Sequence, residues 1–334
     1  MTGILVRRSL MMVLVLIGIT IVTFLLSRVV PTDPARLIAG PRASAEGVAT
    51  VRREYGLDLP LWQQYTRYMS GLVHLDFGKS FHSLRPVAQD LVDFLPATLE
   101  LTLAALLFAV IVGNAIGIIS AVWQNSLADH LARLIAIGGL STPAFWLGIL
   151  AQLLLYQSLG WLPYGGRIGD EVVIPPPITG LITVDSLLSG NWATFGDALH
   201  HLILPALVLG IEPMAILARI MRTSLLEVLR EQYILAARAK GLIERLVIWK
   251  HAIRNALLAV VTMIGLQIGY LLGGSILVET VFSWPGIGRY SARAIVTADY
   301  NAVMGVTLII AAIYLVTNFM VDMMYAWLDP RIRY

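Results

Sequence analysis

The chain has 334 residues, of which 57% are hydrophobic and only 13% are charged. Soluble proteins carry charge on roughly a quarter of their residues, so this composition excludes a soluble enzyme and a disordered chain. A net charge of +3, with the basic residues beside apolar runs, argues against a nucleic-acid binder. The absence of cysteine excludes disulfides, thiolate metal sites and a cysteine nucleophile.

Six apolar runs are long enough to cross a bilayer, which takes about 20 residues. The first run, 9–30, follows Arg7 and Arg8 and predicts an uncleaved membrane anchor, with a removed signal peptide as the alternative. The other runs are 98–123, 134–159, 202–221, 257–279 and 302–327. Pro143 and Pro205 interrupt two of them, which neighbouring helices can tolerate. The predicted fold class is all-α integral membrane, with six transmembrane helices and both chain ends on one side.

The distribution of charge predicts the orientation. The 222–256 loop is rich in Lys and Arg, whereas the 160–201 loop has Arg167 as its one basic residue against four acidic ones. The positive-inside rule therefore places the 222–256 loop and both termini in the cytoplasm.

Residues 31–97 are then external and form a small helical cap. Glu46 to Tyr55 is amphipathic, and apolar residues recur at helical spacing between Leu61 and Leu72. The 160–201 loop contains three consecutive prolines and several glycines, which predicts irregular external structure.

The chain offers no catalytic constellation. Gly78-Lys79-Ser80 is similar to the end of a phosphate-binding loop, but Val73 stands where that loop needs a glycine. No serine, histidine and aspartate set, carboxylate pair or metal-ligand spacing is evident. We therefore predict a non-catalytic chain that binds no nucleotide or metal itself.

Glu100 and Glu279 lie near the external ends of two spans. A carboxylate at membrane depth is a functional candidate because its burial is costly, and the alternative is an interfacial group that faces water.

Glycines at four-residue spacing mark one face of two spans. They are Gly113 and Gly117 in the second run, and Gly265, Gly269 and Gly273 in the fifth. Close helix packing is the simpler interpretation. The alternative is a face that lines a translocation path, with Asn114, Gln267 and Glu279 as its polar candidates.

The 222–256 loop predicts a protruding element. Leu225 to Lys240 reads as a helix, Gly241 breaks it, and a second helix runs from Ile243 into the fifth span. Such an element favours a cytoplasmic docking partner, and the alternative is a merely solvated basic loop.

The segment Glu231 to Gly241, EQYILAARAKG, resembles the "EAA" loop of the permease subunits of bacterial ABC importers. The likeness is greatest to the B-type subunits of the dipeptide and oligopeptide branch. Other matching segments, in order along nearly the whole chain, are PTDPAR at 31–36, YGLDLPL at 55–61, PATLE at 96–100, STPAFW at 141–146, HAIRNALL at 251–258, ETVFSWPG at 279–286 and WLDPRIRY at 327–334. Ala259 replaces the proline usual in the family, so the start of the fifth span is expected to kink less.

The resemblance implies that the loop forms a coupling helix on an ATPase subunit. The candidate residues for this contact are Glu231, Tyr233, Ala236, Ala237, Arg238, Lys240 and Gly241. Small side chains at 236 and 237 would allow a close fit, Gly241 would allow the turn, and Arg238 and Lys240 would make polar contacts.

The implied assembly contains a second, homologous permease subunit, two ABC ATPases and an extracytoplasmic peptide-binding protein, in lipid and without nucleic acid. ATP and Mg would be used by the ATPases, and no cofactor would be bound by this chain. The implied location is the bacterial inner membrane. The solute would be a dipeptide or short peptide, with an oligopeptide, glutathione, a nickel chelate or a sugar as alternatives within the same class.

The expected domains are 1–30 with the first span, the external cap 31–97, a five-helix core 98–327 that carries the 222–256 loop, and a cytoplasmic tail 328–334. An ion-coupled secondary transporter would need carboxylates near the midplane. An intramembrane enzyme would need a catalytic pair at depth. A scaffold without transport would leave the coupling loop unexplained.

Overall fold

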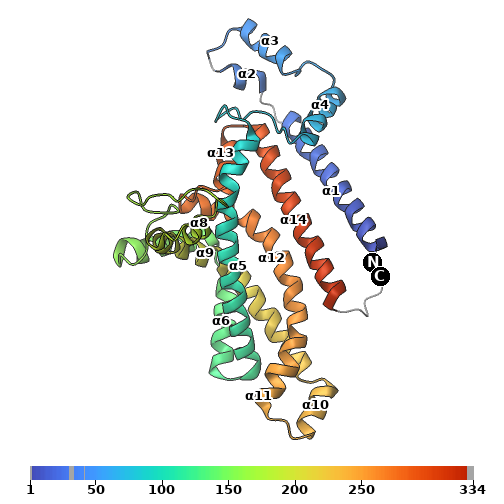
Figure 1. Ribbon diagram of the computed structural model, residues 1–334, viewed down its shortest axis with the longest axis vertical. Coiled ribbons are helices and arrows are strands. Elements are labelled where there is room, and N and C mark those ends of the chain that lie inside the picture. The colour runs from blue at the N-terminus through green and yellow to red at the C-terminus, as the bar shows by residue number, and fades with distance from the viewer. Residues whose placement is uncertain (1, 30–33, 41, 329–334) are drawn as a thin grey trace. The chain divides into compact units, whose positions relative to one another are not determined.

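The computed structural model describes residues 2–29, 34–40 and 42–328, and this part of the chain is almost entirely helical (Figure 1). Within these described residues, β structure is limited to an isolated bridge between Lys79 and Pro86. Contacts divide the chain into two compact units, residues 1–95 with 290–316 and residues 96–289 with 317–332, which are described separately. All but the first residue of the predicted tail 328–334 falls outside the described residues.

The first unit combines one apolar helix with the segment that follows it and part of the last two helices. Its elements are α1 (Thr2–Val29), α2 (Pro34–Ala39), α3 (Ala45–Glu54), α4 (Leu61–Val73), the beginning of α5 (Val87–Val122), most of α13 (Ile287–Val296) and the first half of α14 (Tyr300–Leu328). The two helices predicted within residues 31–97 are confirmed as α3 and α4. Ser44 caps α3 by accepting a hydrogen bond from the Gly47 amide.

Aromatic packing joins α4 to the end of α1. The rings of Phe24 and Tyr65 are 5.4 Å apart, and the Tyr65 hydroxyl is 2.9 Å from the Thr20 hydroxyl. The Ser80 hydroxyl donates to the Asp299 carboxylate at 2.5 Å, so the residue that ends the Gly-Lys-Ser tripeptide serves to connect two parts of this unit.

The second unit holds the remaining helices around α9. They are α5, α6 (Leu127–Ser141), α7 (Ala144–Ala151), a π-helical turn η1 (Gln152–Ser158), α8 (Ile182–Leu188), α9 (Trp192–Val228), α10 (Gln232–Ala239), α11 (Glu244–Leu246), a second π-helical turn η2 (Val247–Ala252) and α12 (Ile253–Val281). Helix α9 contacts α6, α7, α8 and α12 and is the most buried span. It is therefore the centre of this unit.

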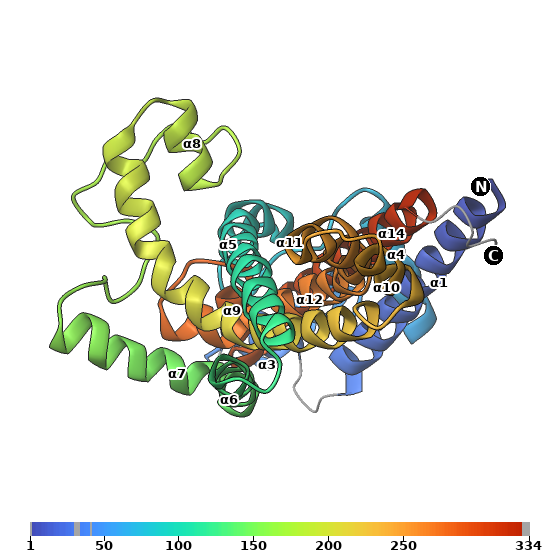
Figure 2. The ribbon, with the colours of Figure 1, turned by 90° about the horizontal axis from the view of Figure 1, so that it is seen from below.

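Five helices are long and apolar enough to cross a membrane, and α6 with α7 makes a sixth if the pair is one span. The predicted run 134–159 is not one straight helix, because α6 and the following helix are bent by 104° (Figure 2). The break falls where Thr142 is extended before Pro143, as expected since proline disfavours helical geometry in the preceding residue. Pro205, by contrast, lies inside an uninterrupted α9.

The 160–201 loop is more ordered than its prolines and glycines suggest, because it contains α8 and the start of α9. Asp185 accepts hydrogen bonds from the amides of 178–180 and the Thr179 hydroxyl. Burial alone would raise the pKa of Asp185, but these hydrogen bonds outweigh it and hold the pKa below the usual value. Arg167 pairs with Glu100 at 2.5 Å, so Glu100 is not the water-facing carboxylate considered above.

Candidate functional site

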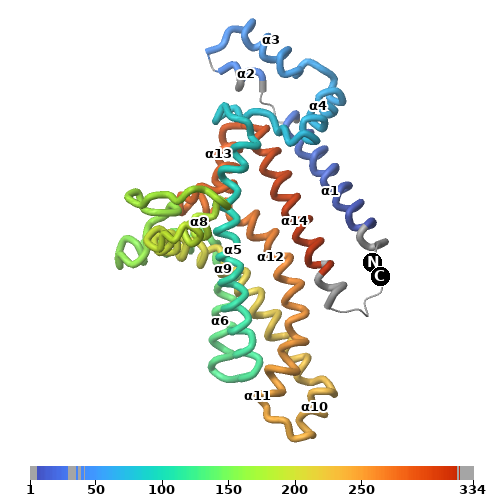
Figure 3. The backbone as a smooth tube through the Cα atoms, in the orientation of Figure 1, coloured from blue at the N-terminus to red at the C-terminus, as the bar shows by residue number. Residues whose placement is uncertain are grey.

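The 222–256 loop folds into a helical protrusion with α10 at its tip (Figure 3). The single helix predicted from Leu225 to Lys240 is wrong, because α9 ends at Val228 and α10 begins after an extended Glu231. The break between α9 and α10 is caused by a tertiary contact. Ile234 is fully buried in a cluster with Leu225 and Val247, and the chain has to turn after α9 to bring Ile234 into that cluster.

The far end of α10 turns at Gly241. This residue has φ of +77°, in the left-handed region that costs a residue with a Cβ about 1–2 kcal/mol. The Gly241 amide donates to the Arg238 carbonyl at 2.9 Å, and the Leu242 amide donates to the Ala237 carbonyl at 3.3 Å. These bonds satisfy the last carbonyls of α10, and the chain then continues into α11, η2 and α12 as predicted.

Two side-chain contacts fix the orientation of α10. The Asn255 amide group donates to the Tyr233 hydroxyl at 2.6 Å and ties α10 to α12. The Arg238 guanidinium donates twice to the Glu244 carboxylate, at 2.6 and 3.1 Å, across the Gly241 turn. The hydrogen bond with Glu244 raises the pKa of Arg238. Arg238, predicted as a contact for a partner, therefore already has a partner within the chain.

The outer surface of this protrusion, here called the α10 face, is apolar and exposed. Its large side chains and their exposed fractions are Tyr233 43%, Leu235 53%, Ile243 69% and Trp249 62%. Ala236 and Lys240 are exposed beside them, whereas Ala237 is partly buried against the cluster around Ile234. Large exposed apolar side chains grouped on one short segment are typical of an interaction site.

The predicted path residue Glu279 is fully buried, so it is not the water-facing carboxylate considered above, and its place in a translocation path stays a prediction. Its carboxylate accepts hydrogen bonds from the Thr98 hydroxyl at 2.7 Å and the Arg289 amide at 2.8 Å. Trp284, in the segment that follows α12, is buried beside it, and its indole N–H donates to the Ala97 carbonyl at 2.8 Å. We call this cluster the Glu279 junction, and it connects the start of the second predicted span to the segment that follows α12.

The other two polar candidates also lie inside the unit. The Asn114 amide donates to the Val110 carbonyl of its own helix at 2.7 Å, and Gln267 is 5% exposed. The side-chain oxygens of both residues, Asn114 Oδ1 and Gln267 Oε1, are buried without a hydrogen-bond partner in the described residues. Their place in a translocation path stays a prediction.

The glycines divide into two groups. A Cβ at Gly113 or Gly117 would lie within 2.7 Å of a carbonyl of α9, and one at Gly265 would overlap Val321 of α14. These three allow close helix packing. Gly273 has nothing within 4 Å, so packing within this chain does not explain it, and Gly269 is half-buried.

Sequence reasoning missed a buried ion pair at the base of the protrusion. Arg222 donates to Asp129 at 2.9 and 3.1 Å, and Asp129 is fully buried. The Ser120 hydroxyl also donates to Asp129. In the sequence, Arg222 is only one of several basic residues of the 222–256 loop. The available signal was Asp129 in the first turn of α6, three residues after the N-cap Ser126.

Comparison with known proteins gives two family matches that together cover most of the chain. Residues 113–334 match the binding-protein-dependent transport system inner membrane component, and residues 1–102 match the N-terminal region of such membrane components.

Curated relatives match over nearly their whole length. The chain is 47% identical to a probable D,D-dipeptide transport system permease protein of Escherichia coli K12, over 96% of this chain and 94% of that protein. It is 45% identical to a dipeptide transport system permease protein of Alkalihalophilus pseudofirmus, over 98% of each. It is 41% identical to a glutathione transport system permease protein of Escherichia coli K12, over 98% of each.

A solved structure has the same fold. The inward-facing MetNI methionine ABC transporter matches with a TM-score of 0.51 at 18% identity, over 70% of this chain and 93% of that one. The likeness supports the six-span helical fold class predicted above.

Proposed function

We propose that this chain is a non-catalytic permease subunit that imports dipeptides or short peptides. The basis is that the chain belongs to the inner membrane components of binding-protein-dependent transport systems. ATP hydrolysis, with its Mg, occurs in two partner ATPases. A second, homologous permease subunit completes the membrane part, and an extracytoplasmic peptide-binding protein delivers the solute.

The observation that carries this proposal is the α10 face on its rigid base. The buried Ile234, the Asn255 contact to Tyr233 and the Gly241 turn hold α10 in one orientation, while its outer side chains remain exposed. A pre-oriented helix transmits force between an ATPase and the spans without first losing conformational entropy. ATP can then shift the permease between states, because the docked ATPase interacts with them differently.

The proposed solute follows from the relatives. Those at 41–47% identity are named for dipeptides, D,D-dipeptides, di- or tripeptides and glutathione. A short peptide is common to these names. An importer of the same class for another solute is the second candidate.

The proposed topology places the termini, and the loop that carries α10, in the cytoplasm. The loop's excess of Lys and Arg supports this orientation. Docking on a cytoplasmic ATPase requires it, since ATP is available on that side.

The test is uptake of a labelled dipeptide by proteoliposomes that contain the complete importer and its binding protein. Ala236→Trp adds bulk on the α10 face, and we expect uptake to fall about tenfold or more, the size of a typical coupling energy. Val296→Trp, at a position 86% exposed on α13, is the matched control and should transport normally. Full uptake with Ala236→Trp would contradict the coupling role of α10.

Competition by unlabelled solutes tests the substrate separately. Dipeptides should compete better than glutathione, a nickel chelate or a sugar. A variant of the α10 face that binds the ATPase poorly but keeps the same order of competing solutes would show that the coupling role and the substrate assignment can be tested independently.

A further inference from the structure

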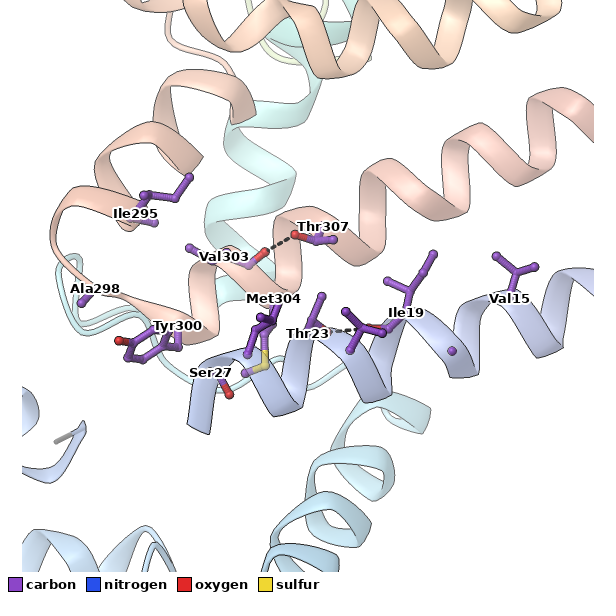
Figure 4. Close-up of a pocket in the computed structure, with 14 residues that line it drawn as sticks. Val15, Ile19, Thr23, Ser27, Ile295, Ala298, Tyr300, Val303, Met304 and Thr307 are labelled. Carbon is purple, nitrogen blue, oxygen red and sulfur yellow. Dashed lines mark hydrogen bonds between the residues drawn. The ribbon is translucent and has the colours of Figure 1, made fainter. Parts of the chain in front are cut away.

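Two cavities adjoin each other in the first unit. One is a groove of about 820 Å³ between α1 and the segment 294–307 (Figure 4). The other is a pocket of about 340 Å³ between the end of α1, α4 and the loop 76–81. Tyr300 and Met304 line both cavities, so a ligand with two chemically different parts could occupy them together.

The groove is apolar along its length. One side is formed by Val15, Ile19, Val22 and Leu26 of α1, and the other by Ile295, Val303 and Met304, among others. Its hydroxyl groups are satisfied by their own helices. Thr23 donates to the Ile19 carbonyl at 2.8 Å, Ser27 to Phe24 at 2.7 Å and Thr307 to Val303 at 2.8 Å. These three hydroxyls therefore need no ligand, and burial of an alkyl chain in the groove is favourable.

The pocket has the opposite character, because some of its buried polar atoms lack partners in the described residues. Arg28 Nε and Gln64 Oε1 are both buried, and neither has a hydrogen-bond partner in the described residues. One atom is a donor and the other an acceptor. An unsatisfied buried polar group is rare and costly, so each implies a ligand atom of the complementary kind.

The charges of the pocket indicate the kind of ligand. Arg28 and Arg67 contribute two positive charges to the lining, and Asp76 contributes one negative charge. Guanidinium groups bind phosphate oxygens well. Gln64 Oε1 and the Asp76 carboxylate accept hydrogen bonds, so they fit an N–H donor on the same ligand.

We propose that these cavities bind one phospholipid with a primary ammonium headgroup, of the phosphatidylethanolamine type. Its phosphate lies at Arg28 and Arg67, its ammonium group faces Gln64 and Asp76, and an acyl chain fills the groove. Arg28 ends the first membrane-spanning segment, which is the depth of a lipid headgroup. A choline headgroup carries no N–H donor and would leave Gln64 Oε1 unsatisfied.

The headgroup is tested by native mass spectrometry of the detergent-purified complex with added phosphatidylethanolamine or phosphatidylcholine. We expect phosphatidylethanolamine to be retained about tenfold more strongly, the factor associated with one charge-assisted hydrogen bond. Arg28→Gln should abolish this preference, whereas Arg53→Gln, a charge change on the exposed face of α3, should preserve it. Equal retention of the two lipids by the wild-type complex would overturn the proposal.

The groove is tested by filling it. A Cβ at Gly18, which lines the groove, meets nothing within 4 Å, so Gly18→Phe adds a ring without a clash in this unit. Leu14→Phe, at a position of α1 that is 61% exposed, is the matched control. We expect Gly18→Phe to lose both lipids and Leu14→Phe to retain them.

Two results with Gly18→Phe would contradict the lipid assignment. The first is lipid retention equal to that of Leu14→Phe. The second is release of the other permease subunit with lipid retention unchanged, which would assign the groove to a protein helix.

Discussion

The Glu279 junction and the α10 face use the same residue types in opposite ways. Each has a tryptophan, and beside each a glutamate accepts hydrogen bonds, Glu279 at the junction and Glu244 across the Gly241 turn. At the junction, Trp284 is 1% exposed and its polar atoms bond within the chain. Near the α10 face, Trp249 is 62% exposed and the Arg238–Glu244 ion pair lies at the surface. The junction therefore stabilises the fold, whereas the α10 face leaves its apolar side chains exposed.

The largest expected contrast comes from the same substitution at both tryptophans. Trp284→Ala removes a buried indole and a hydrogen bond and should destabilise the chain by about 3–5 kcal/mol. Trp249→Ala should change stability by less than about 0.5 kcal/mol but weaken ATPase docking. Thermal unfolding in detergent and co-purification of the ATPase measure the two effects. Equal losses of stability would show that the two regions do not differ as described.

A smaller contrast lies within α10, between neighbours on opposite sides. Ile234 is fully buried and Leu235 is 53% exposed. Ile234→Ala should cost about 2–5 kcal/mol and release α10 from its base. Leu235→Ala should leave α10 in place and reduce uptake. Limited proteolysis of the 229–243 segment distinguishes them, and fast cleavage of Leu235→Ala would refute the assignment of sides.

Gly241→Ala should have a moderate effect, because φ of +77° is unfavourable for alanine by about 1–2 kcal/mol. We expect faster hydrogen exchange confined to α10. Gly273→Ala is the control, since Gly273 is helical and has open space around it. That variant should be neutral or up to about 1 kcal/mol more stable, and equal exchange in both variants would argue against a strained turn.

The smallest effect is expected for the Arg238 and Glu244 pair. Its side chains are 37% and 55% exposed, so solvent screens their attraction. A double-mutant cycle with Arg238→Gln and Glu244→Gln should give a coupling below about 1 kcal/mol that decreases with added salt. A large, salt-independent coupling would mean that the pair is more shielded than its exposure indicates.

The sequence alone determined the membrane class, the position of the apolar spans, the helices within residues 31–97 and the family. These follow from composition and from local periodicity, which act over one span or one helix. The EQYILAARAKG segment located the protrusion. Gly241 located its turn, because a position with left-handed backbone geometry favours glycine, and a glycine can be read directly from the sequence.

Tertiary structure decided which polar residues are structural. Thr98 and Glu279 are 181 positions apart along the chain, and only packing brings them into one buried junction with Arg289. Asp129 and Arg222 are likewise separated by 93 positions. Burial of Ile234 broke a continuous helical pattern into α9 and α10, and Pro143 ended a helix whereas Pro205 did not. In each case the energy of contacts with other helices outweighed the local preference of the chain, and a single sequence does not reveal those contacts.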